Sequence, residues 1–364
     1  PARRAGQAGP LPRQVQGLRL TTHPVGHAHP HLQALIQRAR SEAHAAAQRT
    51  LGIVYPCDAA ALVAAARAVD EGIARPLLIG PREAILRAAA DAEVDASRFE
   101  IVPTADGPRA AAEHATALAR DGAVDALMKG SLHTDELMAP IIHKGSGLRG
   151  TSRISHAFLF DLPRYPKLLG LADCVVNIAP HLPAKRDILG NAIALLQRLG
   201  IARPKVGIVA AIETVNPSIP ATVDAQALVE MARQGAWPGA IVEGPLGFDN
   251  AISREAARIK RIESQVAGDA DLLLVPDLNA GNILYKSFVY IGGGECAGIV
   301  LGARVPIVLT SRADSLTARL ASVALAVLAA PSAADGRIVA ASTSAGTPPD
   351  TPLRSGAATT GSPA

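Results

Sequence analysis

Ser311 and Arg312 form the residue pair whose chemistry is clearest in this sequence. They follow the apolar run VPIVLT and precede a helix-like stretch that begins near Ser315, so they stand where a strand gives way to a helix. The first amides of a helix attract anions. An arginine can hold a phosphate through two parallel hydrogen bonds, and a serine hydroxyl can donate to a thiolate or an oxyanion. Asp314 is a candidate base in the same loop, although Asp314 and Ser315 could also serve only to cap the helix.

Further polar residues follow other strand-like runs. Lys129 is the last residue but one of DALMKG and can offer a point charge to a phosphate, unless it is simply a solvated lysine. Asn216 follows VGIVAAIE, where it could donate to a ligand carbonyl or form a turn with the proline after it. Asp277 and Asn282 lie in PDLNAGN, just after another apolar run. We expect these residues to contribute to substrate binding, because the carboxyl ends of parallel strands meet at one edge of a sheet.

The segment GLRGTSRISH carries two arginines, Arg149 and Arg153, on either side of a Gly-Thr-Ser turn. Two guanidinium groups at this spacing could bind carboxylate or phosphate oxygens. Alternatively, they are exposed arginines in a loop that connects two lobes. His156 follows closely and could act as a general base, but a single histidine beside a strand is more often structural.

A metal site is not predicted. Asp249 and Asp277 both follow strands, but they lie in different loops, without helical spacing and without a nearby histidine. Oxygen-rich metal sites usually need more carboxylates, and an aspartate at a helix N-terminus is explained by capping. The histidines of HPVGHAHPH (23–31) lie in a low-complexity segment and are interpreted as incidental.

The elements that must position these residues alternate between strand-like and helix-like runs. This alternation predicts an α/β fold with mostly parallel sheets and helices on both faces. Two strand-like runs, 154–161 and 168–174, are too close for a crossover helix and predict a hairpin at the start of a second lobe. Because 364 residues exceed the usual size of one core, the predicted domains are a disordered leader (1–30), a first lobe (31–152 plus 302–330), a second lobe (153–301) and a disordered tail (331–364).

Composition limits the possible partners. The net charge is +4 and only 3% of residues are aromatic, without a basic stripe, which argues against a nucleic-acid binder. The sequence contains no run of about 18 apolar residues, so a membrane span is not predicted. Three separate cysteines without a CxxC motif favour a reducing compartment, so we expect a cytoplasmic protein.

Five segments in order resemble the phosphate acetyltransferase and phosphate butyryltransferase family: MKGSLHT, LRGTSRISH, EGPLGFDNAIS, PDLNAGNILYKS and TSRADS. The resemblance covers residues 45–330, and MKG together with SRADS is closer to the butyryltransferase branch. It implies a homodimer of two-lobed chains of the isocitrate/isopropylmalate dehydrogenase type, with an active site in the interlobe cleft. The implied reaction moves a short acyl group, acetyl or butyryl, between coenzyme A and inorganic phosphate. Coenzyme A is then a substrate, and neither a cofactor nor a metal is implied.

Carried over by motif, Ser311 and Arg312 match the pair that contacts the coenzyme A sulfur and the acyl phosphate in acetyltransferases. The catalytic aspartate that the family places a few residues further along the helix is not matched, because Thr317 and Ala318 stand there. Asp314 is the nearest substitute.

The family's arginine before a proline is also not matched, since Ala139 precedes Pro140. Arg149 or Arg153 could supply that charge from another loop. Two alternatives therefore stay open. One is a metal- and NAD-dependent decarboxylating dehydrogenase of the same architecture, which would need clustered carboxylates. The other is a non-catalytic, ligand-binding homologue, because a fold alone does not fix a function.

Overall fold

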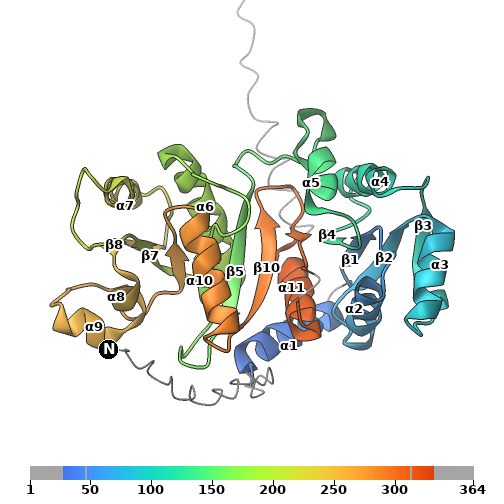
Figure 1. Ribbon diagram of the computed structural model, residues 1–364, viewed down its shortest axis with the longest axis horizontal. Coiled ribbons are helices and arrows are strands. Elements are labelled where there is room, and N and C mark those ends of the chain that lie inside the picture. The colour runs from blue at the N-terminus through green and yellow to red at the C-terminus, as the bar shows by residue number, and fades with distance from the viewer. Residues whose placement is uncertain (1–27, 46, 312–313, 332–364) are drawn as a thin grey trace, which may run out of the picture.

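A computed structural model describes residues 28–45, 47–311 and 314–331. The described residues form one eleven-stranded sheet in the order β3-β2-β1-β4-β11-β10-β5-β6-β9-β7-β8, which runs from right to left in Figure 1. The strands are β1 (Thr50–Val54), β2 (Arg75–Gly80), β3 (Glu100–Pro103), β4 (Ala126–Lys129), β5 (Ser155–Asp161), β6 (Leu169–Ala172), β7 (Lys205–Val209), β8 (Ile241–Leu246), β9 (Leu272–Leu274), β10 (Glu295–Leu301) and β11 (Ile307–Val308).

Helices connect most of these strands and cover both faces of the sheet. They are α1 (Pro30–Ala45), α2 (Ala59–Asp70), α3 (Arg82–Asp91), α4 (Pro108–Arg120), α5 (Thr134–Ile142), α6 (Leu182–Arg198), α7 (Pro220–Arg233), α8 (Phe248–Ile252), α9 (Arg254–Ile259), α10 (Leu278–Tyr290) and α11 (Leu316–Ala329), with short 3-10 helices at Ala96–Arg98 and Lys144–Ser146. No helix in the described ranges is both long and apolar enough to cross a membrane.

The predicted α/β class is confirmed, and the sheet is mostly parallel. The antiparallel pairings all involve β5 or β10, including the β5–β6 hairpin that the sequence predicts. Where the sequence predicts sheets in two lobes, the structure joins both sets of strands into one sheet. The join is made by β10 and β11, which pair through Val300 and Ile307. The likeness to isocitrate dehydrogenase and the two-lobe division stay predictions.

Strand β10 is absent from the sequence-based prediction. The glycines of IGGGE, just before it, predict a flexible turn, although the CAGIVL run that follows them is typical of a buried strand. In the structure β10 is a central strand that pairs with β5 from Glu295↔Asp161 to Leu301↔Ser155.

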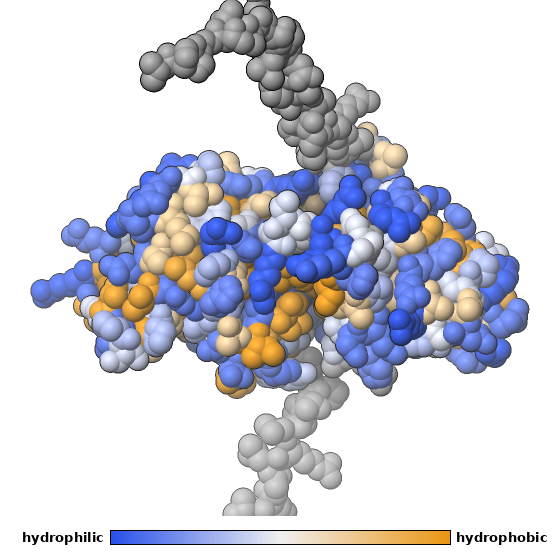
Figure 2. Space-filling model, turned by 90° about the horizontal axis from the view of Figure 1, so that it is seen from above, coloured by the Kyte–Doolittle hydropathy of each residue, from blue (hydrophilic) through white to orange (hydrophobic). Residues whose placement is uncertain are grey.

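The two faces of the sheet are packed differently. On one face, side chains such as Ile53, Met128 and Leu159 join helices α1, α2, α6, α7 and α11 in a single apolar cluster. The opposite face has two separate clusters, one under α4 and α5 and the other under α8 and α10. These two clusters meet along β10, near the middle of the sheet, since Val300 belongs to the first cluster and Cys296 to the second. Figure 2 shows a largely hydrophilic surface with apolar patches near the middle of its length.

Candidate active site

Two neighbouring cavities meet where β4 and β11 end. Lys129, Thr134, Thr310 and Ser311 line both of them. The first, here called the aromatic cavity, has a volume of about 350 Å³ and also reaches Phe158, Val175, Tyr285, Lys286, Cys296, Gly298, Leu309, Asp314, Ala318 and Ser322. The second, here called the polar cavity, has about 660 Å³ and also reaches Asp58, Ala59, Ala60, Ala61, Gly130, Ser131, Leu132, His133 and Arg319.

Ser311 lies at the junction of the two cavities and is hydrogen-bonded to Asp314; this hydrogen-bonded connection is here called the turn. The amide N–H of Ser311 donates to Asp314 Oδ2 at 2.6 Å, and the amide N–H of Asp314 donates to the carbonyl oxygen of Ser311 at 3.2 Å. Ser315 then caps α11 by accepting from the amide N–H of Ala318. Asp314 therefore stabilises the turn and not the helix cap, and its carboxylate lines the aromatic cavity. Arg312, the other half of the predicted pair, lies outside the described residues.

Arg319 supports this turn from inside α11. Its Nη2 donates to the carbonyl oxygen of Ser311 at 2.6 Å, and its Nε donates to that of Asp314 at 3.4 Å. The side chain is buried, on a helix whose other buried residues are nearly all apolar. Burying a charged group is costly unless it is hydrogen-bonded. Arg319 is not among the site residues predicted from the sequence. The signal that could reveal it is a single arginine inside the apolar run LTARLASVALAVLA.

The electrostatic surroundings of Asp314 suit a proton acceptor. Burial raises the pKa of this carboxyl above its ordinary value, and the nearby Glu295 raises it further. The hydrogen bond from the amide of Ser311 and the charges of Arg319 and Lys129 act in the opposite direction without reversing the shift. Lys129 also donates to the carbonyl oxygen of Leu132 at 3.1 Å, which holds its ammonium group at the junction.

The two arginines of GLRGTSRISH do not line either cavity. Arg149 is exposed and forms an isolated bridge with Ala303. Arg153 donates through Nε to Asn177 Oδ1. Among the residues that the structure describes, Lys129 and Arg319 bring cationic side chains to the junction, and Lys286 lines the aromatic cavity.

The remaining predicted binding residues use their side chains to fix local backbone. Asn216 Oδ1 accepts from the amide of Ser218, in a turn before α7. Asp277 caps α10 by accepting from the amide of Ala280 at 3.0 Å. Asn282 donates to the carbonyl oxygen of Cys174 at 3.4 Å. None of the three lines the two cavities, but α10, which follows Asp277, supplies Tyr285 and Lys286 to the aromatic cavity. The binding roles of these residues stay predictions.

The other acidic residue considered for a metal, Asp249, pairs with Lys260, which also binds Glu213. The loop after β8, which carries Asp249, thus belongs to an ion-pair group separate from the two cavities. Within the described ranges, no cluster of three or more His, Cys, Asp or Glu side chains could hold a metal ion.

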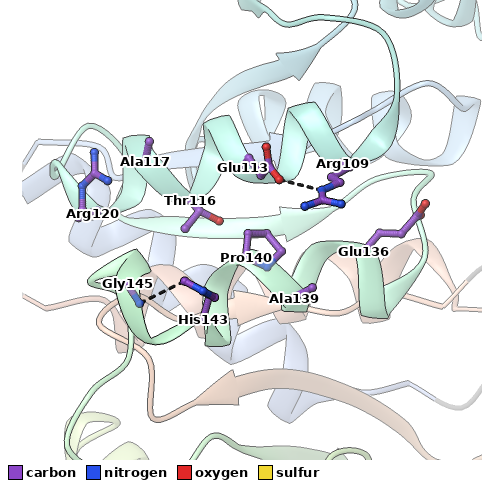
Figure 3. Close-up of a pocket in the computed structure, with 10 residues that line it drawn as sticks. All are labelled: Arg109, Glu113, Thr116, Ala117, Arg120, Glu136, Ala139, Pro140, His143 and Gly145. Carbon is purple, nitrogen blue, oxygen red and sulfur yellow. Dashed lines mark hydrogen bonds and ion pairs between the residues drawn. The ribbon is translucent and has the colours of Figure 1, made fainter.

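A larger groove of about 690 Å³ lies between α4 and α5 (Figure 3). Two of its charged side chains, Arg109 and Glu113, form an ion pair with each other. Ala139 and Pro140, where the family pattern has an arginine before the proline, line this groove and neither of the two cavities. Its separation from Ser311 makes it less suited to the predicted chemistry than the two smaller cavities.

His156 is placed behind the wall of the aromatic cavity. It is 1% exposed, its ring packs against Phe158 with 4.4 Å between centroids, and Nδ1 has no hydrogen-bond partner among the described residues. Burial lowers the pKa of His156 below its ordinary value, and the charge of Asp173 only partly opposes this. The imidazole is therefore neutral and enclosed, which favours the structural interpretation of this histidine.

Comparisons with known proteins identify the family of this chain. The family model described as phosphate acetyl/butaryl transferase matches residues 107–327. A phosphate acetyltransferase of Rhizobium meliloti is 49% identical over 294 residues, which are 81% of this chain and 92% of the relative. A probable phosphate butyryltransferase of Bacillus subtilis (strain 168) is 40% identical over 281 residues, 77% of this chain and 93% of the relative. The crystal structure of a branched-chain phosphotransacylase from Enterococcus faecalis V583 superposes with a TM-score of 0.69 at 30% identity and covers 77% of this chain and 98% of that one.

The buried imidazole predicts how stability depends on pH. The unfolded chain takes up a proton on His156 at the ordinary pKa near 6.5, whereas the folded chain takes it up only at lower pH. The unfolded state then binds more protons, so the free energy of unfolding should fall as the pH drops below about 6.5. One such group changes the free energy of unfolding by up to ~1.4 kcal/mol per pH unit.

Urea unfolding at pH 7.5 and 5.5 measures this change. The free energy of unfolding should decrease less between the two pH values for His156→Leu than for the wild type. His114→Gln, at an exposed position of α4, is the control, and equal decreases in all three proteins would contradict the prediction.

Proposed function

This chain belongs to the phosphate acetyl/butyryl transferase family, and we propose that it transfers a short acyl group, acetyl or butyryl, between coenzyme A and inorganic phosphate. The observation that carries the proposal is the turn from Ser311 to Asp314, which lies where two cavities meet, with Lys129 beside it and Arg319 beneath it. One cavity can then receive the phosphate-bearing groups while the other receives the acyl group.

The reaction needs charge stabilisation and positioning. A phosphate oxygen attacks the carbonyl carbon of the thioester, the C–O bond forms, the C–S bond breaks, and the sulfur leaves with the electron pair and takes up a proton. Negative charge develops on the carbonyl oxygen during this exchange. Ser311 and Lys129 supply donors at the junction, and Arg312 is assigned to the acyl phosphate by its motif. Holding two anionic substrates in line contributes through positioning, without a covalent intermediate on the enzyme.

The polar cavity suits phosphate groups. Lys129 and Arg319 bring positive charge to its wall, and Ser131 brings a hydroxyl group. The N-terminus of α2 also faces it, and such a helix end favours anions. Asp58, which caps α2 through a hydrogen bond from the amide of Ala61 at 2.8 Å, partly offsets that field.

We assign the proton transfer to Asp314. In the direction of acyl-CoA synthesis, its carboxylate would accept the proton of the coenzyme A thiol. Because its pKa is raised, it is a stronger base than an exposed aspartate. Coenzyme A is a substrate in this scheme, and neither a metal nor a further cofactor takes part. We further propose that the enzyme acts as a cytoplasmic homodimer, with the cleft between the two predicted lobes as its active site.

The direct test mixes acetyl-CoA or butyryl-CoA with phosphate in the presence of EDTA and follows free thiol. Release of thiol that depends on phosphate supports the proposal, and no release with either thioester would exclude it.

In the same assay, Arg312→Ala should lower turnover by at least ~10²-fold, as expected when a donor to a developing negative charge is removed. Circular dichroism should show an unchanged fold. Near-wild-type turnover would refute the role of Arg312.

A second prediction concerns the base. Asp314→Asn retains the shape of the side chain but cannot accept the proton, so kcat should fall by ~10²–10⁴. The wild-type rate should decline as the pH falls through the raised pKa of Asp314, and this acid limb should be lost in the variant. A pH profile of Asp314→Asn that keeps the wild-type acid limb would assign the base elsewhere.

Variants of Arg319 distinguish a role in positioning Asp314 from a role in stability alone. Its positive charge lowers the pKa of Asp314, so Arg319→Met should move the acid limb of the kcat profile to higher pH and also reduce kcat. Arg319→Lys retains the charge and should leave the limb near its wild-type position, although it loses the second hydrogen bond to the turn. If both variants keep the wild-type limb and lose only stability, Arg319 has a structural role alone.

A further inference from the structure

We propose that the aromatic cavity receives the acyl chain, and that Phe158, Tyr285 and Cys296 set the longest chain that the enzyme accepts. This inference rests on the proposed acyl transfer and adds to it the residues that select the substrate. The family matches do not settle that selection, because one relative is named for acetyl transfer and another for butyryl transfer.

The wall of the aromatic cavity is built from three different elements. Phe158 comes from β5 and Tyr285 from α10, and their rings stack with 4.5 Å between centroids and 12° between planes. Cys296 comes from β10, two residues before Gly298. A stacked pair anchored on a strand and a helix is a rigid surface, so the space beside it has a fixed size.

Gly298 gives the aromatic pair its position. A Cβ atom at residue 298 would approach the Phe158 ring to 2.6 Å and His156 to 2.9 Å, so any side chain here would force the ring to move. The glycine lets Phe158 lie close against β10, and both residues line the cavity.

The polar atoms of this wall carry no charge at neutral pH. Burial raises the pKa of the Cys296 thiol well above its ordinary value, and burial also raises the pKa of the Tyr285 hydroxyl. The charged side chains of Lys129 and Asp314 lie where the cavity meets the turn at Ser311. Lys286, next to Tyr285 on α10, also lines this cavity, with its ammonium group 5.5 Å from the centroid of the Tyr285 ring. A carbonyl group held at Ser311 would direct its hydrocarbon chain toward the uncharged wall of Phe158, Tyr285 and Cys296, which is the environment that apolar groups prefer.

The size of the cavity bears on which chain fits. A volume of about 350 Å³ is far more than the methyl group of an acetyl thioester fills. Each methylene group that enters such a space should improve kcat/KM by about fourfold, provided that it becomes fully buried. The wild-type enzyme should therefore prefer butyryl-CoA and similar chains to acetyl-CoA.

The experiment measures kcat/KM of the full-length protein for acetyl-, butyryl-, hexanoyl- and octanoyl-CoA with phosphate, by free-thiol release. The wild type should favour butyryl-CoA over acetyl-CoA by at least about tenfold. Cys296→Leu, which fills the cavity, should lower the ratio of butyryl to acetyl turnover at least about tenfold. Tyr285→Ala, which opens the wall, should raise the relative rates of hexanoyl- and octanoyl-CoA.

Ile283→Ala is the matched control, because Ile283 lies on the same helix as Tyr285 but is 67% exposed. Its chain-length profile should equal that of the wild type. A wild type that prefers acetyl-CoA, or variants that change all thioesters equally, would overturn the inference while leaving acyl transfer intact. Loss of phosphate-dependent thiol release with every thioester would instead overturn the proposed function and this inference together. If Cys296→Leu does not fold, the profile of Tyr285→Ala decides the question.

Discussion

The candidate site depends on one constraint in the sheet: β11 is only two residues long. It pairs with β10 through Val300 and Ile307, and the rest of β10 toward Glu295 has no strand on that side. A buried backbone donor must find a partner elsewhere. The amide N–H of Gly298 does so by donating to the hydroxyl of Ser322 on α11, at 3.0 Å. Because the strand stops there, the chain leaves the sheet at Thr310, and the space beside β10 becomes a cavity instead of a continued ladder.

The same constraint explains why a charged side chain lies inside an otherwise apolar helix. Once the chain has left β11, the carbonyl oxygens of Ser311 and Asp314 have no strand partner. Arg319 donates to both from the second turn of α11. A leucine at this position would avoid the cost of burying a charge, but it would remove the side-chain donor from both carbonyl groups and leave that of Ser311 with the amide of Asp314 alone. The cost of burying the guanidinium group is thus offset by the fixed geometry of the turn that carries Ser311.

The sequence predicted the elements better than it predicted the site. Buried parallel strands appear as short apolar runs, so LGIVYP (51–56) and PLLIG (76–80) predict β1 and β2 to within two residues. The Ala-rich run between them predicts a helix over Ala59–Asp70, which has the observed bounds of α2. Strand β10 was missed because its preceding glycines dominated the local pattern. Asn216 and Asp277 stand at the expected sheet edge, but their side chains bond to nearby backbone. No sequence pattern distinguishes an asparagine or aspartate that caps a turn from one that points into a cavity, because both uses favour the same positions.

The absent helix carboxylate can be understood from the same geometry. The family pattern has its catalytic aspartate near position 318, where this chain has an alanine. Ala318 lines the aromatic cavity, so a carboxylate at this position would face the proposed substrate site. Asp314 reaches the same cavity from the turn before the helix, where Arg319 fixes its backbone. An acid on the turn is positioned by hydrogen bonds to main chain, whereas an acid on the helix would be positioned by the helix itself. The proposed base at Asp314 allows a small residue at 318, which lines the aromatic cavity. Of the three wall residues, Phe158 and Cys296 lie outside the family motifs, so chain-length selection can change while the motifs that identify the family stay the same.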